Sequence, residues 1–139
     1  MRKKYLLDTN VISEINKKIP NQSVVEKVSL YQREIVTASI VVHELLYGSL
    51  RLPPESAKRQ FLLDYVSQIP LKMPIFDYDF KSAQYHAQER ARLSKIGKTP
   101  AFADGQIASI AFTNNLILVT NNVKDFADFQ GLKIDNWFN

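Results

Sequence analysis

Short apolar runs rich in β-branched residues alternate along this chain with stretches of helical periodicity. The runs lie at residues 5–7, 35–38, 73–76, 116–119 and 132–134. Each is too short for a helix and is predicted to form a buried strand. Strands separated by helices favour parallel pairing through crossover helices. We therefore predict an α/β fold, a three-layer sandwich in which helices flank a short, mostly parallel central sheet.

Capping and punctuation signals predict where the longer helices begin. These starts are Ser23, Ser39, Pro53-Pro54, Asp77 or Asp79, and Thr99-Pro100. The helix that follows the two prolines is predicted to run to about Ile69, and the next to about Lys95. No internal repeat or linker interrupts the 139 residues, so we predict one domain over residues 1–139.

Composition excludes several classes of protein. The chain has no cysteine, which rules out a disulfide scaffold, a thiol nucleophile and cysteine-ligated zinc. Asp8 interrupts the apolar stretch near the start too early for a signal peptide, and no apolar run approaches the length of a membrane span. We expect a cytoplasmic protein with no membrane segment. The formal net charge of +4 is compatible with a polyanionic partner.

Four acidic residues occupy positions where chemistry is expected in a parallel sheet, near the carboxyl ends of the strands. Asp8 ends the first predicted strand, and Asp125 follows shortly after the strand at residues 116–119. Glu44 and Asp104 lie on early turns of two predicted helices. Each has an alternative role: Asp8 as a helix cap, Glu44 as a solvated flank, Asp125 in ordering a turn. For Asp104 the alternative is weakest, because no Lys or Arg lies three or four positions away.

Convergent carboxylates repel one another, and a hard divalent cation relieves that repulsion. Oxygen ligands suit Mg²⁺ or Mn²⁺, whereas zinc prefers the Cys and His side chains that this chain has few of. Such an ion orients an attacking water and neutralises phosphate charge. Composition and spacing together therefore predict a carboxylate-held Mg²⁺ or Mn²⁺ site suited to phosphodiester chemistry.

Three rival interpretations fail on single positions. Residues 97–99 read Gly-Lys-Thr, but a phosphate-binding loop needs Gly where Arg92 stands. Residues 43–44 begin like a zinc-protease helix, but Tyr47 replaces the second histidine. A phosphorylation receiver domain needs adjacent acids after its first strand, and Asp8 stands alone there.

Four segments resemble the PIN-domain ribonucleases, and specifically the VapC-type toxins of toxin–antitoxin pairs. Their order and separations fit along the whole chain. They are Leu6-Leu7-Asp8-Thr9-Asn10, Val42-His43-Glu44-Leu45 with Gly48 following, Phe102-Ala103-Asp104-Gly105-Gln106-Ile107-Ala108, and Val119-Thr120-Asn121-Asn122-Val123-Lys124-Asp125-Phe126.

The resemblance implies a PIN-like fold and a metal-dependent endoribonuclease. It assigns Asp8, Glu44 and Asp104 as metal-binding carboxylates. Relatives differ at the fourth position, which here is either Asn122 or Asp125. We expect Asp125 to be the fourth ligand, directly or through water. Supporting residues are expected to be Asn10, Thr120 and Asn122.

The resemblance also implies partners and products. The substrate would be a structured RNA, cut by hydrolysis to leave a 5′-phosphate and a 3′-hydroxyl. A cognate antitoxin, a homodimer, and operator DNA bound only through the antitoxin are implied as well. A PIN-fold partner in a DNA-binding complex, with a regulatory rather than RNA-degrading role, is the alternative. Because acids repel RNA, basic residues near the site are expected to bind it, with Lys95, Lys98 and Arg92 as candidates.

Overall fold

The computed structural model describes residues 2–139 and contains one five-stranded sheet in the order β3-β2-β1-β4-β5, with every pair parallel. Met1, which the predicted domain range includes, lies outside the described residues. The central strand pairs on both sides, with Leu6 opposite Val36 and Leu118. The strands are β1 (Tyr5–Leu7), β2 (Ile35–Ala38), β3 (Ile75–Phe76), β4 (Ile117–Val119) and β5 (Lys133–Asp135).

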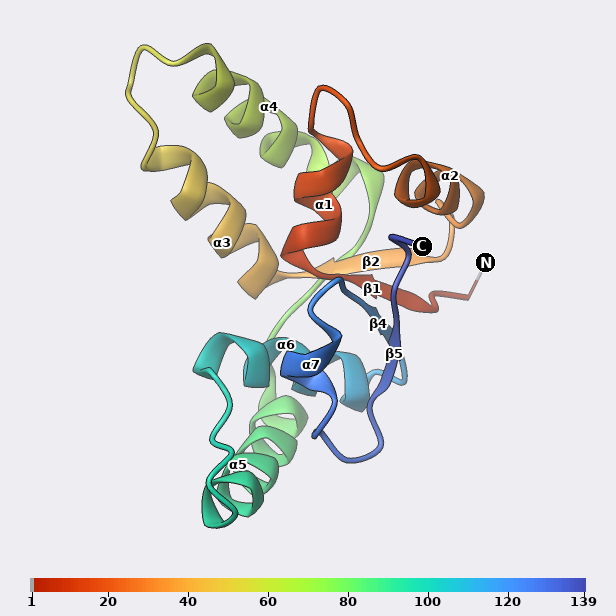
Figure 1. Cartoon of the computed structure of the whole chain (residues 1–139), viewed down its shortest axis with the longest axis vertical. Helices are drawn as coiled ribbons and strands as arrows, with labels where there is room; N and C mark the ends of the chain where they lie inside the picture. The colour runs from red at the N-terminus through yellow and green to blue at the C-terminus, as the bar shows by residue number, and fades with distance from the viewer. Residues whose placement is uncertain (1) are drawn as a thin grey trace.

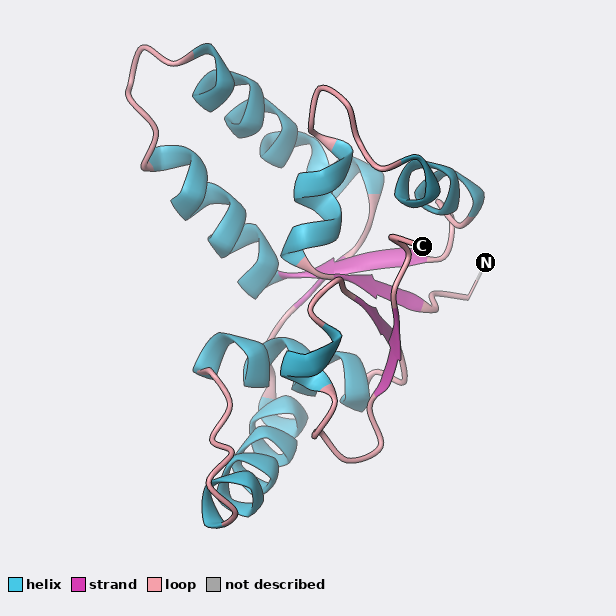
Figure 2. Cartoon of the chain, in the orientation of Figure 1, coloured by secondary structure: helices cyan, strands magenta, loops and turns pink. Residues whose placement is uncertain are grey.

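Helices cover both faces of the sheet and complete the predicted three layers (Figures 1 and 2). Helices α1 to α4 lie on one side, and α5 to α7 lie on the other (Figure 1). The helices are α1 (Thr9–Ile15), α2 (Gln22–Leu30), α3 (Ser39–Leu50), α4 (Ala57–Lys72), α5 (Phe80–Lys95), α6 (Phe102–Thr113) and α7 (Val123–Phe126). The predicted α/β class and parallel sheet are confirmed.

The core forms where the sheet meets its two helical layers. Strands β1 and β2 are buried along their whole lengths, as expected of parallel strands covered on both faces. Most of α6 is buried too, from Gly105 to Ala111. At the far end of the chain, Trp137 is buried against the rings of Tyr5 and Tyr31. The sheet is therefore well packed on both faces, and the loops at its edges extend from this core.

The helix that carries Asp104 begins later than its sequence signal predicts. Thr99 was expected to cap it, but the Thr99 hydroxyl instead donates to Ser94 Oγ at 2.9 Å. The backbone stays extended through Ala101, with ψ at 142°. Helix α6 therefore starts at Phe102, and Asp104 lies in its first turn. This shift moves the carboxylate to the end of the helix, beside the sheet edge.

Other helix starts also differ from prediction because better caps lie nearby. Asn21, rather than Ser23, caps α2 through a 3.2 Å bond from Val24 N. Ser56 caps α4 by accepting from Arg59 N, so that helix begins after the two prolines rather than at them. Ser39 is the first residue of α3 and not its cap. Asp79, one of the two predicted candidates, does cap α5.

No helix in residues 2–139 is long and apolar enough to cross a membrane.

Candidate active site

Asp8 ends β1 and is 5% exposed. One carboxylate oxygen accepts from Thr9 N at 2.8 Å, which makes Asp8 the cap of α1. The other accepts from Thr120 Oγ1 at 2.8 Å and from Asn10 Nδ2 at 3.0 Å. Burial raises the pKa of Asp8 above its ordinary value and the nearby Glu44 charge adds to this, while the hydrogen bonds oppose it. The capping role and the site role predicted for Asp8 therefore coexist.

Thr120 links the two strand ends that meet at the site. It follows β4, is fully buried, and donates its hydroxyl proton to Asp8. The same oxygen accepts from Asn10 Nδ2 at 3.1 Å and from Asn122 N at 3.0 Å. Asn10 Oδ1 in turn accepts from Asn121 N at 2.9 Å. The three expected supporting residues, Asn10, Thr120 and Asn122, thus form one network that fixes the orientation of the Asp8 carboxylate.

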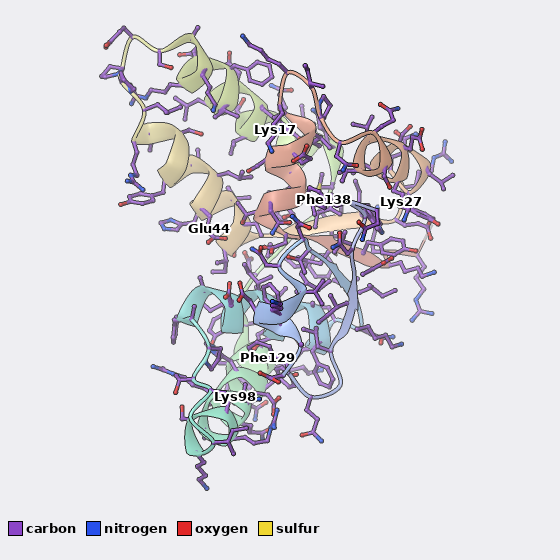
Figure 3. All side chains as sticks on the ribbon, viewed as in Figure 1. Lys17, Lys27, Glu44, Lys98, Phe129 and Phe138 are labelled. Carbon is purple, nitrogen blue, oxygen red and sulfur yellow. The ribbon has the colours of Figure 1, made fainter. Side chains whose placement is uncertain are left out.

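Glu44 approaches the same edge from α3. Its Oε1 accepts a hydrogen bond of 2.6 Å from Thr9 Oγ1, across 35 residues of sequence. Figure 3 shows Glu44 on the part of α3 nearest the sheet. Thr9 is the residue directly after Asp8, so this bond brings the Glu44 carboxylate of α3 next to the turn that begins at Asp8.

The pKa of Asp104 responds to the charges of the other three acids. Its pKa is raised from 3.8 to about 6, first by burial and then by the charges of Asp125, Asp8 and Glu44. A carboxylate responds in this way only to like charges within a short range. Four acids that are scattered from position 8 to position 125 therefore share one electrostatic environment.

Asp125 lies in the first turn of α7, just beyond β4. Of the three acids that raise the Asp104 pKa, it exerts the largest effect. Asn122, the other candidate for the fourth position, takes part through its backbone: its N–H donates to Thr120 and its carbonyl accepts from Asp125 N at 3.0 Å. Of the two candidates, Asp125 is the one whose charge acts on Asp104, while Asn122 contributes backbone hydrogen bonds.

The donor set has the chemistry that a hard divalent cation requires. All four side chains offer carboxylate oxygens, and none of the ion pairs formed within residues 2–139 involves them. Their negative charge is therefore left uncompensated by the chain itself. Within that same range, no three acidic or imidazole groups converge tightly enough to form a ready-made metal cluster. The residues fit such an ion in charge and ligand type.

Helix α6 reaches the site because Gly105 allows close packing against α5. A Cβ at Gly105 would overlap His86 Nε2 and lie 2.6 Å from His86 Cδ2. His86 is buried, and its Nδ1 lies 2.8 Å from the Tyr78 hydroxyl. Any larger residue at position 105 would push apart the two helices, and with them the adjacent Asp104.

Two of the three basic residues predicted to bind RNA already contact acids of this chain. Arg92 donates two hydrogen bonds to the buried Glu89 and one to the Asp128 carbonyl, which gives it a structural role. Lys98 pairs with the Asp128 carboxylate at 3.7 Å. Figure 3 places Lys98 beside α5, far from Glu44. Lys95 is exposed in the last turn of α5.

Sequence reasoning missed two residues of the site. Thr9 positions Glu44, and Asn121 positions Asn10 through its backbone. Both are direct neighbours of predicted residues in the matched segments, which is the signal that could have found Thr9. The 35-residue separation between Thr9 and Glu44 leaves no trace in the sequence.

Comparisons with known proteins agree with this fold. The family model described as the PIN domain matches residues 5–132. The tRNA(fMet)-specific endonuclease VapC of Shigella flexneri is 32% identical over 96% of this chain and 98% of its own length. The crystal structure of FitAcB from Neisseria gonorrhoeae superposes with a TM-score of 0.87 at 32% identity, covering 97% of this chain and 99% of that one. DNA-bound VapBC from Salmonella typhimurium gives 0.82 at 30% identity, covering 97% and 98%.

Proposed function

This chain belongs to the PIN-domain family and, within it, to the VapC ribonucleases, and from that premise we propose that it is a Mg²⁺- or Mn²⁺-dependent endoribonuclease. The observation that carries the proposal is the hydrogen bond from Thr9 to Glu44, which brings the Glu44 carboxylate beside the turn that Asp8 begins. The pKa of Asp104, raised by burial and by the charges of the other three acids, supports it. Carboxylates at one edge of the sheet that have no cationic partner are suitable ligands for a divalent cation.

The residues proposed to hold the ion are Asp8, Glu44, Asp104 and Asp125. When bound, the ion would neutralise charge on a phosphodiester and lower the pKa of water nearby. The network of Thr120, Asn10 and the Thr9 amide keeps the Asp8 carboxylate in one orientation. Thr9 does the same for Glu44. These contacts fix two of the four acids before any ligand arrives.

Asp104 couples the site to pH. With a pKa of about 6, its carboxyl carries a proton in an appreciable fraction of molecules at neutral pH. Cation binding requires the deprotonated form, so it must release that proton. We therefore expect metal affinity, and with it RNA cleavage, to fall as the pH drops below about 6.

Cleavage of a purified structured RNA tests the proposal. A transfer RNA is the first substrate to try, because one similar protein is named for that activity. We expect cleavage with Mg²⁺ or Mn²⁺, none in EDTA, and product ends that carry a 5′-phosphate and a 3′-hydroxyl. Asp104→Asn should abolish cleavage. Asp77→Asn, which removes an exposed acid outside the site, should not. Full activity in EDTA would refute the metal-dependent mechanism.

We further propose a cognate antitoxin as partner, a homodimer as the assembly, and the cytoplasm as the location. Similar solved chains come from toxin–antitoxin complexes, and several of those complexes hold promoter or other DNA. That observation favours a second role, in which this chain occupies operator DNA through its antitoxin. A gel-shift assay with and without the antitoxin tests it, and DNA binding by this chain alone would contradict the indirect mode.

A further inference from the structure

A second cluster of charge lies at the opposite edge of the sheet, where the strands begin. A cavity of about 460 Å³ opens there, and its lining includes four cationic side chains and one acid. The cations come from the segment before β1 and from β5. The lining residues are Arg2, Lys3, Lys4, Glu34, Asn115, Ile117 and Lys133, and we call this the amino-edge pocket.

The sheet holds the backbone of the amino-edge pocket in place. Lys4 N donates to Glu34 O at 2.8 Å, and Lys4 O accepts from Ile117 N at 2.8 Å. Lys133 pairs with Ile117 in the parallel register of β4 and β5. The side chains of Lys4 and Lys133 therefore start from a backbone that the sheet holds in place, and both residues are exposed. The Lys4 ammonium lies 5.3 Å from the centroid of the Tyr5 ring.

The positive charge of the amino-edge pocket is largely uncompensated. Four cations against one acid leave a formal charge of +3, out of +4 for the whole chain. No ion pair formed by the part of the chain from Arg2 onward includes Glu34 or these cations. Lys3 bonds only a neutral group, the Arg33 carbonyl, at 2.9 Å. Such a cavity attracts anions, and no aromatic residue is among those that line it.

An RNA that is cut at the edge of the sheet where the four acids lie requires cationic contacts to offset their charge. The gathered carboxylates repel phosphates, and two of the three cations expected to offset this, Arg92 and Lys98, are already paired with acids. We propose that the amino-edge pocket binds backbone phosphates of the RNA substrate. This inference rests on the proposed function, because it takes the ligand to be the RNA that is cut. The central strand β1 is only three residues long, about 10 Å. Because the two edges face opposite ways, an RNA that contacts both must pass around the outside of the molecule.

Binding of a folded transfer RNA to the Asp8→Asn variant, which we expect not to cut it, tests the proposal. Lys4→Ala combined with Lys133→Ala should weaken binding on the order of tenfold at moderate salt, and should make the slope of log K against log salt less steep by about 1.4–1.8. The control, Lys72→Ala combined with Lys81→Ala, makes the same change in net charge at exposed positions outside the pocket. It should have a much smaller effect.

Two further arms keep the result decisive. Lys4→Arg combined with Lys133→Arg should restore binding, which separates phosphate contact from damage to the fold. Equal losses of RNA affinity in the pocket and control variants would overturn the proposal. Binding of duplex DNA is measured in parallel, and a loss of affinity for DNA but not for RNA would overturn it too. Cleavage by the wild-type protein is measured separately, so a protein that binds RNA at the pocket but never cuts it would refute the proposed function alone.

Discussion

Replacing Asp104 by Asn should stabilise the protein at neutral pH. In wild type, the environment of Asp104 disfavours the ionised carboxyl at this pH, because burial and three nearby acids raise its pKa from 3.8 to about 6. At 1.36 kcal/mol for each pKa step, this corresponds to about 3 kcal/mol lost from the free energy of unfolding. An amide has nearly the same shape and carries no charge. The variant therefore escapes the repulsion while filling the same space.

Two effects reduce that gain. Asp104 is partly open to solvent, which screens the charges and cuts the benefit to about 1.5 kcal/mol. A negative charge in the first turn of α6 also favours the helix dipole, and losing it costs about 0.5 kcal/mol. The net expectation is a gain of about 1 kcal/mol, or a rise of about 4 °C in Tm.

The gain depends on pH in a definite direction. Because the folded-state pKa is raised, wild type carries no penalty below pH 3.8, where the carboxyl is protonated in both the folded and unfolded states. The penalty grows between pH 3.8 and about 6 and is complete above that range. The difference in stability between Asp104→Asn and wild type should follow the same curve.

Urea denaturation in EDTA at a series of pH values from 4 to 8 measures this curve. The control is Asp77→Asn, which removes an exposed acid that makes no hydrogen bond or ion pair anywhere in residues 2–139. The reasoning is refuted if Asp104→Asn lowers stability at pH 7, or if its effect is the same at pH 4 as at pH 8. Either result would mean that the acid supports the fold.

Three further predictions concern the metal, the α5–α6 packing and a buried ion pair. Mg²⁺ at 100 times its Kd should stabilise wild type by about 2.7 kcal/mol and Asp104→Asn much less, as read by thermal denaturation; equal shifts would contradict a shared site. Gly105→Ala should cost about 1–3 kcal/mol through its overlap with His86. Adding His86→Ala should recover part of that loss, and additive losses would argue against the contact. Glu89→Gln should cost about 1–2 kcal/mol at pH 7, because the carboxylate accepts from Arg92 and from a backbone N–H. The Arg92 contact lowers the Glu89 pKa, so this cost should fade as the pH drops below 4.5; a cost that is constant with pH would count against the ion pair.

The order of strands and helices could be predicted from the sequence because it is encoded locally. An apolar run such as residues 35–38 is too short for any buried element except a strand. Asp is among the residue types preferred as helix N-caps, and Asp79 is an example. Parallel pairing then follows from the intervening helices. The choice of Asp8, Glu44, Asp104 and Asp125 needed only the rule that ligands gather at the carboxyl ends of strands, together with the resemblance of four segments to a known family.

Tertiary structure decided the contacts that join distant parts of the chain. The Thr9–Glu44 hydrogen bond spans 35 residues, and the bond from Thr120 to Asp8 spans 112. The pairing of Arg92 with Glu89 is local, yet it matters because Gln130 and Asp128 come from elsewhere to complete it. Local propensity acts over a few residues, whereas charge and hydrogen bonding act over a few ångströms in any direction. Only folding determines which side chains come within that range, and so only the structure could bring Arg2, Lys3, Lys4 and Lys133 to one pocket.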